Sequence, residues 1–120
     1  MKPDFSPDLD RYADHCRWLL ANGCNGLGIL GTTGEANSFG FDERKAVLEG
    51  LLARGVPAAR LMPGTGCASL TDTVELTKHA KAQGCRGVLV LPPFYYKGPS
   101  DDGLCAWFGE VVNRVGGGIA

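Results

Sequence analysis

The sequence lacks the features that mark several large function classes. No apolar run approaches the length of a membrane span, and the first ten residues, MKPDFSPDLD, lack the apolar core of a signal peptide. Positive and negative charges nearly cancel, with a formal net charge of −1 and no run of like charges. These absences argue against nucleic acid or a membrane surface as a partner and favour a small ligand in a cytoplasmic protein.

The cysteines form no C-x-x-C pair, and their number is odd. Wide spacing of this kind is not typical of a zinc site or a redox motif. We therefore expect no metal site, and we expect the thiols to be reduced, mostly buried apolar side chains. The five residues are Cys16, Cys24, Cys67, Cys85 and Cys105.

The chain has the size and composition of one globular domain. It contains 120 residues, of which 44% are apolar and 21% are charged. These values are ordinary for a folded protein and argue against disorder. We treat residues 1–120 as a single domain.

Apolar residues at helical spacing predict four helices. The first covers 6–22, with Ser6 as N-cap, Pro7 in the first turn and Gly23 as the stop. The others cover 41–54, 69–84 and about 101–115. The first and last have the clearest apolar stripes, formed by Leu9, Tyr12, Ala13, Cys16, Leu19 and Leu20, and by Leu104, Trp107, Phe108, Val111, Val112 and Val115.

Three short apolar runs lie between these helices. GLGIL at 26–30, ARLM at 59–62 and GVLVL at 87–91 are uninterrupted, which is typical of parallel strands that are covered on both faces. The predicted order is therefore α-β-α-β-α-β-α.

An internal repeat favours a barrel fragment. ANGCNGLGIL at 21–30 and AQGCRGVLVL at 82–91 share Ala, Gly, Cys, Gly and Leu in register. Units of about 30 residues that alternate strand and helix build the (β/α)₈ TIM barrel, which takes roughly 250 residues. The predicted fold class is α/β, a partial TIM barrel of about half the usual size. A flavodoxin-like sheet also fits this length, but such a sheet would normally begin with a strand.

The loop after the first run, GTTGEANSF at 31–39, is the main candidate site. Gly31 and Gly34 permit a tight turn, and the amides and hydroxyls of Thr32 and Thr33 can surround a carboxylate. A phosphate is less suited, because the loop lacks the P-loop lysine and no basic residue is close in sequence. The alternative is that these residues only build a turn, with Glu35 in solvent.

The later loops have weaker signals. PGTGCASLTD at 63–72 has a G-x-G before a helix, for which helix entry is the simpler role. In PPFYYKGP at 92–99, Tyr95 and Tyr96 offer hydroxyls for proton transfer, although packing alone would also explain them. Lys97 has no neighbouring group that would lower its pKa, so we interpret it as a solvated lysine. We interpret His15 and His79 as surface residues.

Taken together and in this order, GTTGEANSF, PGTGCAS and PPFYYKGPS resemble the dihydrodipicolinate synthase and N-acetylneuraminate lyase family of pyruvate-dependent class I aldolases. The resemblance extends over nearly the whole chain. It implies a small 2-keto acid such as pyruvate as substrate, with no metal and no cofactor, in a homo-oligomer. The chain would correspond to strands two to four and helices one to four of the family fold.

The resemblance also implies roles for individual residues. In the family the G-T-T-G-E loop binds the carboxylate of pyruvate, which gives that role to Gly31, Thr32 and Thr33. Thr32 also corresponds to a proton-relay hydroxyl. Tyr96, the second tyrosine of the pair, resembles the relay tyrosine that in many members reaches into the site of a neighbouring subunit.

The resemblance further implies an imine-forming lysine on the sixth strand, which has no counterpart in these 120 residues. Two readings follow. The chain is either the N-terminal part of a Schiff-base lyase, inactive by itself, or a non-catalytic half-barrel that pairs with another half. A nucleotide or phosphate binder is a third and weaker alternative, because no basic residue lies near either glycine-rich loop in the sequence.

Overall fold

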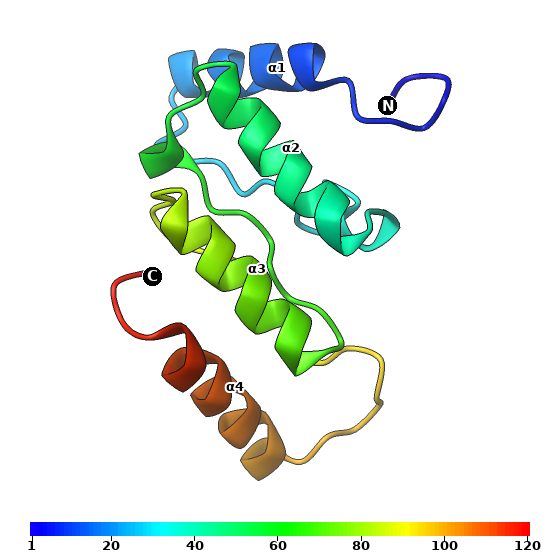
Figure 1. The fold of residues 1–120 in the computed structure, drawn as a ribbon, viewed down its shortest axis with the longest axis vertical. Helices are drawn as coiled ribbons and strands as arrows, with labels where there is room; N and C mark the ends of the chain where they lie inside the picture. Colours follow the sequence, from blue (N-terminus) through cyan, green and yellow to red (C-terminus); the bar gives the residue numbers. More distant parts are fainter.

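The computed structural model describes residues 1–120 and is dominated by helices. The four α-helices are α1 (Leu9–Ala21), α2 (Phe41–Ala53), α3 (Leu70–Ala82) and α4 (Asp101–Val115), and the 3-10 helices are η1 (Ala36–Ser38) and η2 (Ala58–Arg60). The α-helices lie in chain order along the molecule, and each packs mainly on the next (Figure 1). None of them is long and apolar enough to span a bilayer.

The last three helices begin where their sequences predict. Ser69 caps α3, and its hydroxyl accepts a hydrogen bond from the Asp72 amide at 3.3 Å. Ser100 caps α4 in the same way, accepting from the Gly103 amide at 3.2 Å. At the start of α2 the Glu43 carboxylate accepts the Gly40 amide at 2.7 Å, which satisfies a donor that the helix leaves free.

The predicted start of α1 was wrong. Asp8, not Ser6, is the N-cap, and its carboxylate accepts the Arg11 amide at 3.1 Å. Ser6 instead donates its amide and its hydroxyl to the Asp4 carboxylate, which gives it a local partner outside the helix. The predicted stop is confirmed, because Gly23 follows the helix with φ 102°, a left-handed conformation that favours glycine.

The three predicted strands form extended segments but no regular strands. The segments around residues 27, 61–64 and 86–89 are joined by two isolated parallel bridges, Leu27 to Leu61 and Gly64 to Leu89. The Met62 amide donates to the Leu27 carbonyl at 2.9 Å, and the Leu89 amide donates to the Pro63 carbonyl at 3.0 Å. The three segments are parallel, as predicted, but they do not form continuous strands.

The sequence explains why each segment is short. Pro63 has no amide hydrogen and interrupts the middle segment, and Leu30 ends the first segment because its φ of 52° is left-handed. The third segment pairs with the middle segment and with the end of the chain, where the Val88 amide donates to the Ala120 carbonyl at 2.8 Å.

The core lies between α1, α2 and the first two extended segments. Its most buried side chains include Ala13, Cys16, Val47, Leu51, Val56 and Leu61. The expectation that each segment is covered on both faces was wrong for residues 87–91. Leu89 and Leu91 are 40% and 44% exposed, because no layer of this chain covers that face of the segments.

Two other expectations about burial also needed correction. Val111 is the only buried residue of α4, and Val112 is 64% exposed, so the predicted stripe is not a continuous core contact. Cys16 and Cys85 are buried as expected, but Cys67 is half-buried and Cys24 and Cys105 are exposed. All five thiols are free.

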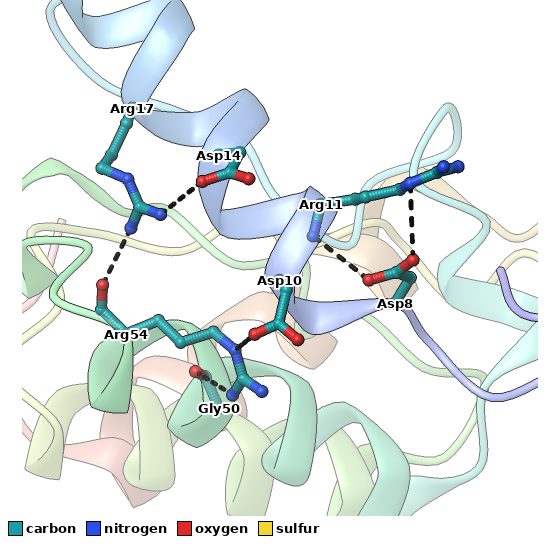
Figure 2. A network of polar contacts seen from close by, with 7 residues as sticks. All are labelled: Asp8, Asp10, Arg11, Asp14, Arg17, Gly50 and Arg54. Atoms are coloured by element: carbon teal, nitrogen blue, oxygen red, sulfur yellow. Dashed lines mark hydrogen bonds and ion pairs between the residues drawn. The ribbon is translucent and has the colours of Figure 1, made fainter.

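Polar contacts join the outer faces of α1 and α2 (Figure 2). The Arg54 Nε atom lies 2.7 Å from the Asp10 carboxylate, and Arg54 Nη1 also donates to the Gly50 carbonyl at 3.0 Å. From α1, Arg17 donates to the Arg54 carbonyl at 2.9 Å and to Asp14. The hydrogen bond from Arg54, followed by its charge, lowers the pKa of Asp10.

Candidate functional site

The loop after the first extended segment is a closed turn with left-handed residues at both ends. Leu30 has φ 52° and Glu35 has φ 54°, and residues other than glycine rarely adopt this left-handed backbone conformation. The turn is closed by hydrogen bonds from the Glu35 amide to the Thr32 carbonyl at 3.1 Å and from the Ala36 amide to the Gly31 carbonyl at 3.2 Å. The left-handed positions therefore fall on Leu30 and Glu35, not on the two glycines of the loop.

The threonines of this turn keep free donors. Thr32 and Thr33 are exposed, and neither amide donates to another backbone group. Adjacent unpaired amides and hydroxyls in a turn form a concave set of donors that suits an anion such as a carboxylate. The carboxylate-binding role of these residues stays a prediction.

A cavity of about 200 Å³ lies beside the turn, at the ends of the three extended segments. It is large enough for several water molecules, each of which occupies about 30 Å³ in the liquid. Gly31 and Thr32 line it, while Thr33 does not. The other lining residues are Leu30, Ala36, Asn37, Gly64, Gly66, Leu89, Val90 and Leu91.

Glycines let the backbone of the second loop pack closely against the cavity. A Cβ atom on Gly64 would lie 1.9 Å from the Leu30 carbonyl oxygen, and one on Gly66 would lie 2.4 Å from the Leu91 nitrogen. Such distances are far shorter than any non-bonded contact, so only glycine fits at these two positions without movement of the backbone.

Threonines fix the second loop to α3. The Thr73 hydroxyl accepts the Cys67 amide at 3.0 Å and donates to the Ser69 carbonyl at 2.9 Å. The hydroxyls of Thr65 and Thr77 lie 2.8 Å apart and are buried. The loop around Gly66 therefore enters the helix as predicted and is hydrogen-bonded to α3 beside the cavity.

Arg44, which the sequence analysis passed over, connects the two loops. Its side chain comes from α2 and is buried, with the residue only 6% exposed. Nε donates to the Ala36 carbonyl at 3.0 Å, and Nη1 donates to the Gly66 carbonyl at 3.2 Å. The argument that no basic residue lies near either glycine-rich loop was therefore wrong. A sequence signal existed, because Arg44 shares the buried stripe of α2 with Val47, Leu48 and Leu51.

The Arg44 guanidinium also contacts Cys67. Nη1 of Arg44 is 3.4 Å from Cys67 Sγ. Burial raises the pKa of the Cys67 thiol, while the charge of Arg44 lowers it and that of Asp72 raises it. The thiol is thus in its neutral form at ordinary pH.

Tyr96 is not brought to this cavity within the chain. Tyr95 and Tyr96 are 76% and 69% exposed, and their rings meet edge to face with centroids 5.4 Å apart. The packing role considered for them is not seen, because most of each ring is in solvent.

No lysine lines the cavity. Lys97 is exposed, as expected.

The two histidines lie outside the cavity lining. His15 is exposed and stacks on Trp18, whereas His79 is only partly exposed and its Nε2 atom lies 2.8 Å from the Glu49 carboxylate. No group of three or more His, Cys, Asp or Glu side chains could hold a metal ion.

Comparison with known proteins identifies the family. The sequence model described as "Dihydrodipicolinate synthetase family" matches residues 3–117. The chain belongs to this family. The resemblance noted from the sequence motifs is confirmed.

Individual family members support the assignment. The 4-hydroxy-tetrahydrodipicolinate synthase of Thermus thermophilus is 37% identical over 81% of this chain, which spans only 32% of that protein. The crystal structure of dihydrodipicolinate synthase from Agrobacterium tumefaciens superposes with a TM-score of 0.93 at 39% identity, covering 97% of this chain and 40% of the other.

A second solved structure carries a ligand. The family member YagE from Escherichia coli, in complex with pyruvate, is similar with a TM-score of 0.83 at 32% identity and covers 95% of this chain and 38% of its own. The matching structures in this family are TIM barrels. The chain thus spans about a third of the length of the curated relatives and two fifths of the solved chains.

Proposed function

We propose that this chain forms the keto-acid-binding part of a Schiff-base lyase of the dihydrodipicolinate synthase type. The observation that carries the proposal is the turn at residues 31–34, whose Thr32 and Thr33 amides are unpaired and whose Gly31 and Thr32 line the cavity. The carboxylate of pyruvate or a related 2-keto acid would accept hydrogen bonds from Gly31, Thr32 and Thr33. The pyruvate complex of YagE supports this choice of ligand.

The chemistry of such a lyase proceeds through a covalent imine. A lysine amine attacks the ketone carbon of pyruvate and water leaves; loss of a proton then gives an enamine that adds to an aldehyde. In our proposal the Thr32 hydroxyl relays protons in these steps, together with Tyr96 contributed by a second copy of the chain. The absence of lysine from the cavity lining supports a nucleophilic lysine outside these 120 residues.

We further propose that the three extended segments and four helices are about half of a (β/α)₈ barrel, equivalent to strands two to four and helices one to four. Leu89 and Leu91 are then residues of the barrel interior, which accounts for their exposure in this chain. The uncovered face and the exposed Tyr95 and Tyr96 favour a homo-oligomer or pairing with a complementary half. We place the protein in the cytoplasm.

Titration with pyruvate tests the binding role. Thr32→Val removes a hydroxyl from the cavity at nearly constant volume, so we expect pyruvate affinity to fall about tenfold, the usual loss for a hydrogen bond to a charged group. Thr71→Val is the matched control, because Thr71 is exposed on α3, and it should leave the affinity unchanged. Equal affinities for all three proteins would exclude the proposed site.

Borohydride trapping tests the position of the lysine. Incubation of the chain with pyruvate and borohydride should give no reduced adduct by intact mass. An adduct on any of its lysines would overturn the assignment of the nucleophile to another segment. Absence of both binding and trapping would favour the alternative, a non-catalytic half-barrel.

A further inference from the structure

The Arg44 guanidinium is a buried positive charge without an anionic partner. It is absent from all six ion pairs of the structure. Its acceptors are the Ala36 and Gly66 carbonyls, the Asn37 side-chain oxygen at 3.4 Å and the Cys67 sulfur. Burial of a charge is costly unless it is compensated, and hydrogen bonds to neutral groups compensate only part of that cost.

Three of the four acceptors of Arg44 belong to residues that line the cavity. Ala36, Asn37 and Gly66 all line it, and they come from two loops that are about thirty residues apart in sequence. Ala36 is also the residue whose amide closes the turn that contains Thr32. Arg44 therefore contacts both the keto-acid turn and the glycine-rich loop opposite it.

We infer that Arg44 is a positioning residue that fixes the two cavity loops relative to each other and supplies the positive charge that favours an anionic ligand between them. The inference rests on the proposed keto-acid site for its ligand, but the joining of the two loops stands independently. A guanidinium suits this role because its planar fork directs donors to several acceptors at once, which an ammonium on a flexible stem cannot do.

Three variants separate the positioning role of Arg44 from the effect of its positive charge. Arg44→Met removes both the fork and the charge, and Arg44→Lys keeps the charge alone. Arg54→Met is the matched control, because Arg54 also donates to a carbonyl and a side chain (Figure 2) but does not line the cavity. Each variant of the full chain is compared by hydrogen exchange without ligand and by titration with pyruvate and with its neutral amide, pyruvamide.

For Arg44→Met we expect faster amide exchange at 31–37 and 64–67, and a loss of pyruvate affinity of about tenfold, with a smaller loss for pyruvamide. Arg44→Lys should recover part of the pyruvate affinity, while exchange in both loops stays fast. A structural role alone would affect the two ligands equally and would give no recovery by lysine. Arg54→Met should show the same amide exchange rates in both loops as the original chain.

The inference is overturned if the amide exchange rates of Arg44→Met in both loops equal those of the original chain. It is also overturned if the affinity of this variant falls equally for pyruvate and for pyruvamide. If Arg44→Met fails to fold, Arg44→Lys decides alone. Faster amide exchange in the two loops, together with a retained preference for pyruvate over pyruvamide, supports the inference. Amide exchange equal to that of the original chain overturns it. If the original chain binds no pyruvate, the proposed function fails, whereas the exchange comparison still decides whether Arg44 joins the loops.

Discussion

At the scale of single residues, the candidate site depends on close backbone contacts and on unpaired donors. Gly64 lies against the Leu30 carbonyl, and Leu30 itself has a left-handed backbone just before the turn that holds Thr32. The geometry of that turn is thus linked to the neighbouring loop through backbone atoms, which cannot move aside as a flexible side chain can. Substitutions at these positions should alter stability and site geometry together.

Gly64→Ala should destabilise the fold by about 1–3 kcal/mol or more, because the new methyl group would lie 1.9 Å from the Leu30 oxygen. Gly31→Ala is the matched control, since a Cβ there meets nothing within 4 Å and its φ is not left-handed. Urea unfolding of both variants measures the effect. A smaller loss for Gly64→Ala than for Gly31→Ala would contradict the close approach.

Buried titratable groups should make the protein sensitive to alkaline pH. Burial raises the pKa of Cys16 and Cys85, and burial followed by the charge of Cys16 raises the pKa of Tyr12. A raised pKa in the folded state means that the stabilisation is complete below the unfolded-state pKa and is lost as pH rises through the folded-state value. Stability should therefore be constant near neutral pH and fall above about pH 9.

Urea unfolding at a series of pH values measures this fall. Cys16→Ala should be less stable at neutral pH but should lose less stability than the original chain on the alkaline side. If the two proteins lose stability in parallel above pH 9, Cys16 does not contribute to the effect.

At the scale of elements, helix boundaries follow local capping chemistry, and α1 is the informative case. The sequence predicted Ser6 as the N-cap, but Asp8 accepts the Arg11 amide while Ser6 bonds to Asp4. Asp8→Ala should destabilise the protein by about 1 kcal/mol, and Ser6→Ala should cost less than half as much. Thermal unfolding of the two variants gives the comparison, and a larger effect for Ser6→Ala would contradict the assigned cap.

Local signals in the sequence predicted the helices well and the extended segments only in outline. The cap at Ser69 and the stop at Gly23 act within a few residues, so they can be read from sequence alone. The extended segments depend on neighbours far away in the chain, and the apolar run at 87–91 did not by itself indicate that Leu89 would be exposed on one side. Arg44 was missed, although it lies on the buried stripe of α2, because the sequence does not show that its guanidinium reaches the Ala36 and Gly66 carbonyls of two loops.

At the scale of the whole molecule, the uncovered face should drive association. Leu89 and Leu91 are both at least 40% exposed, and exposed apolar surface of this kind favours contact between copies. We expect sedimentation velocity to show a dimer or larger species that increases with concentration. Leu91→Glu should reduce association by placing a charge on the uncovered face. A monomer at all concentrations would contradict the expectation.

The most direct test of the central claim is a pyruvate titration of the isotopically labelled chain, followed through its backbone amide signals. The account predicts saturable shifts centred on Gly31, Thr32 and Thr33, with smaller shifts at Gly64 and Gly66 across the cavity. Shifts centred elsewhere, or none at all at millimolar pyruvate, would contradict the assignment of this turn as a keto-acid site.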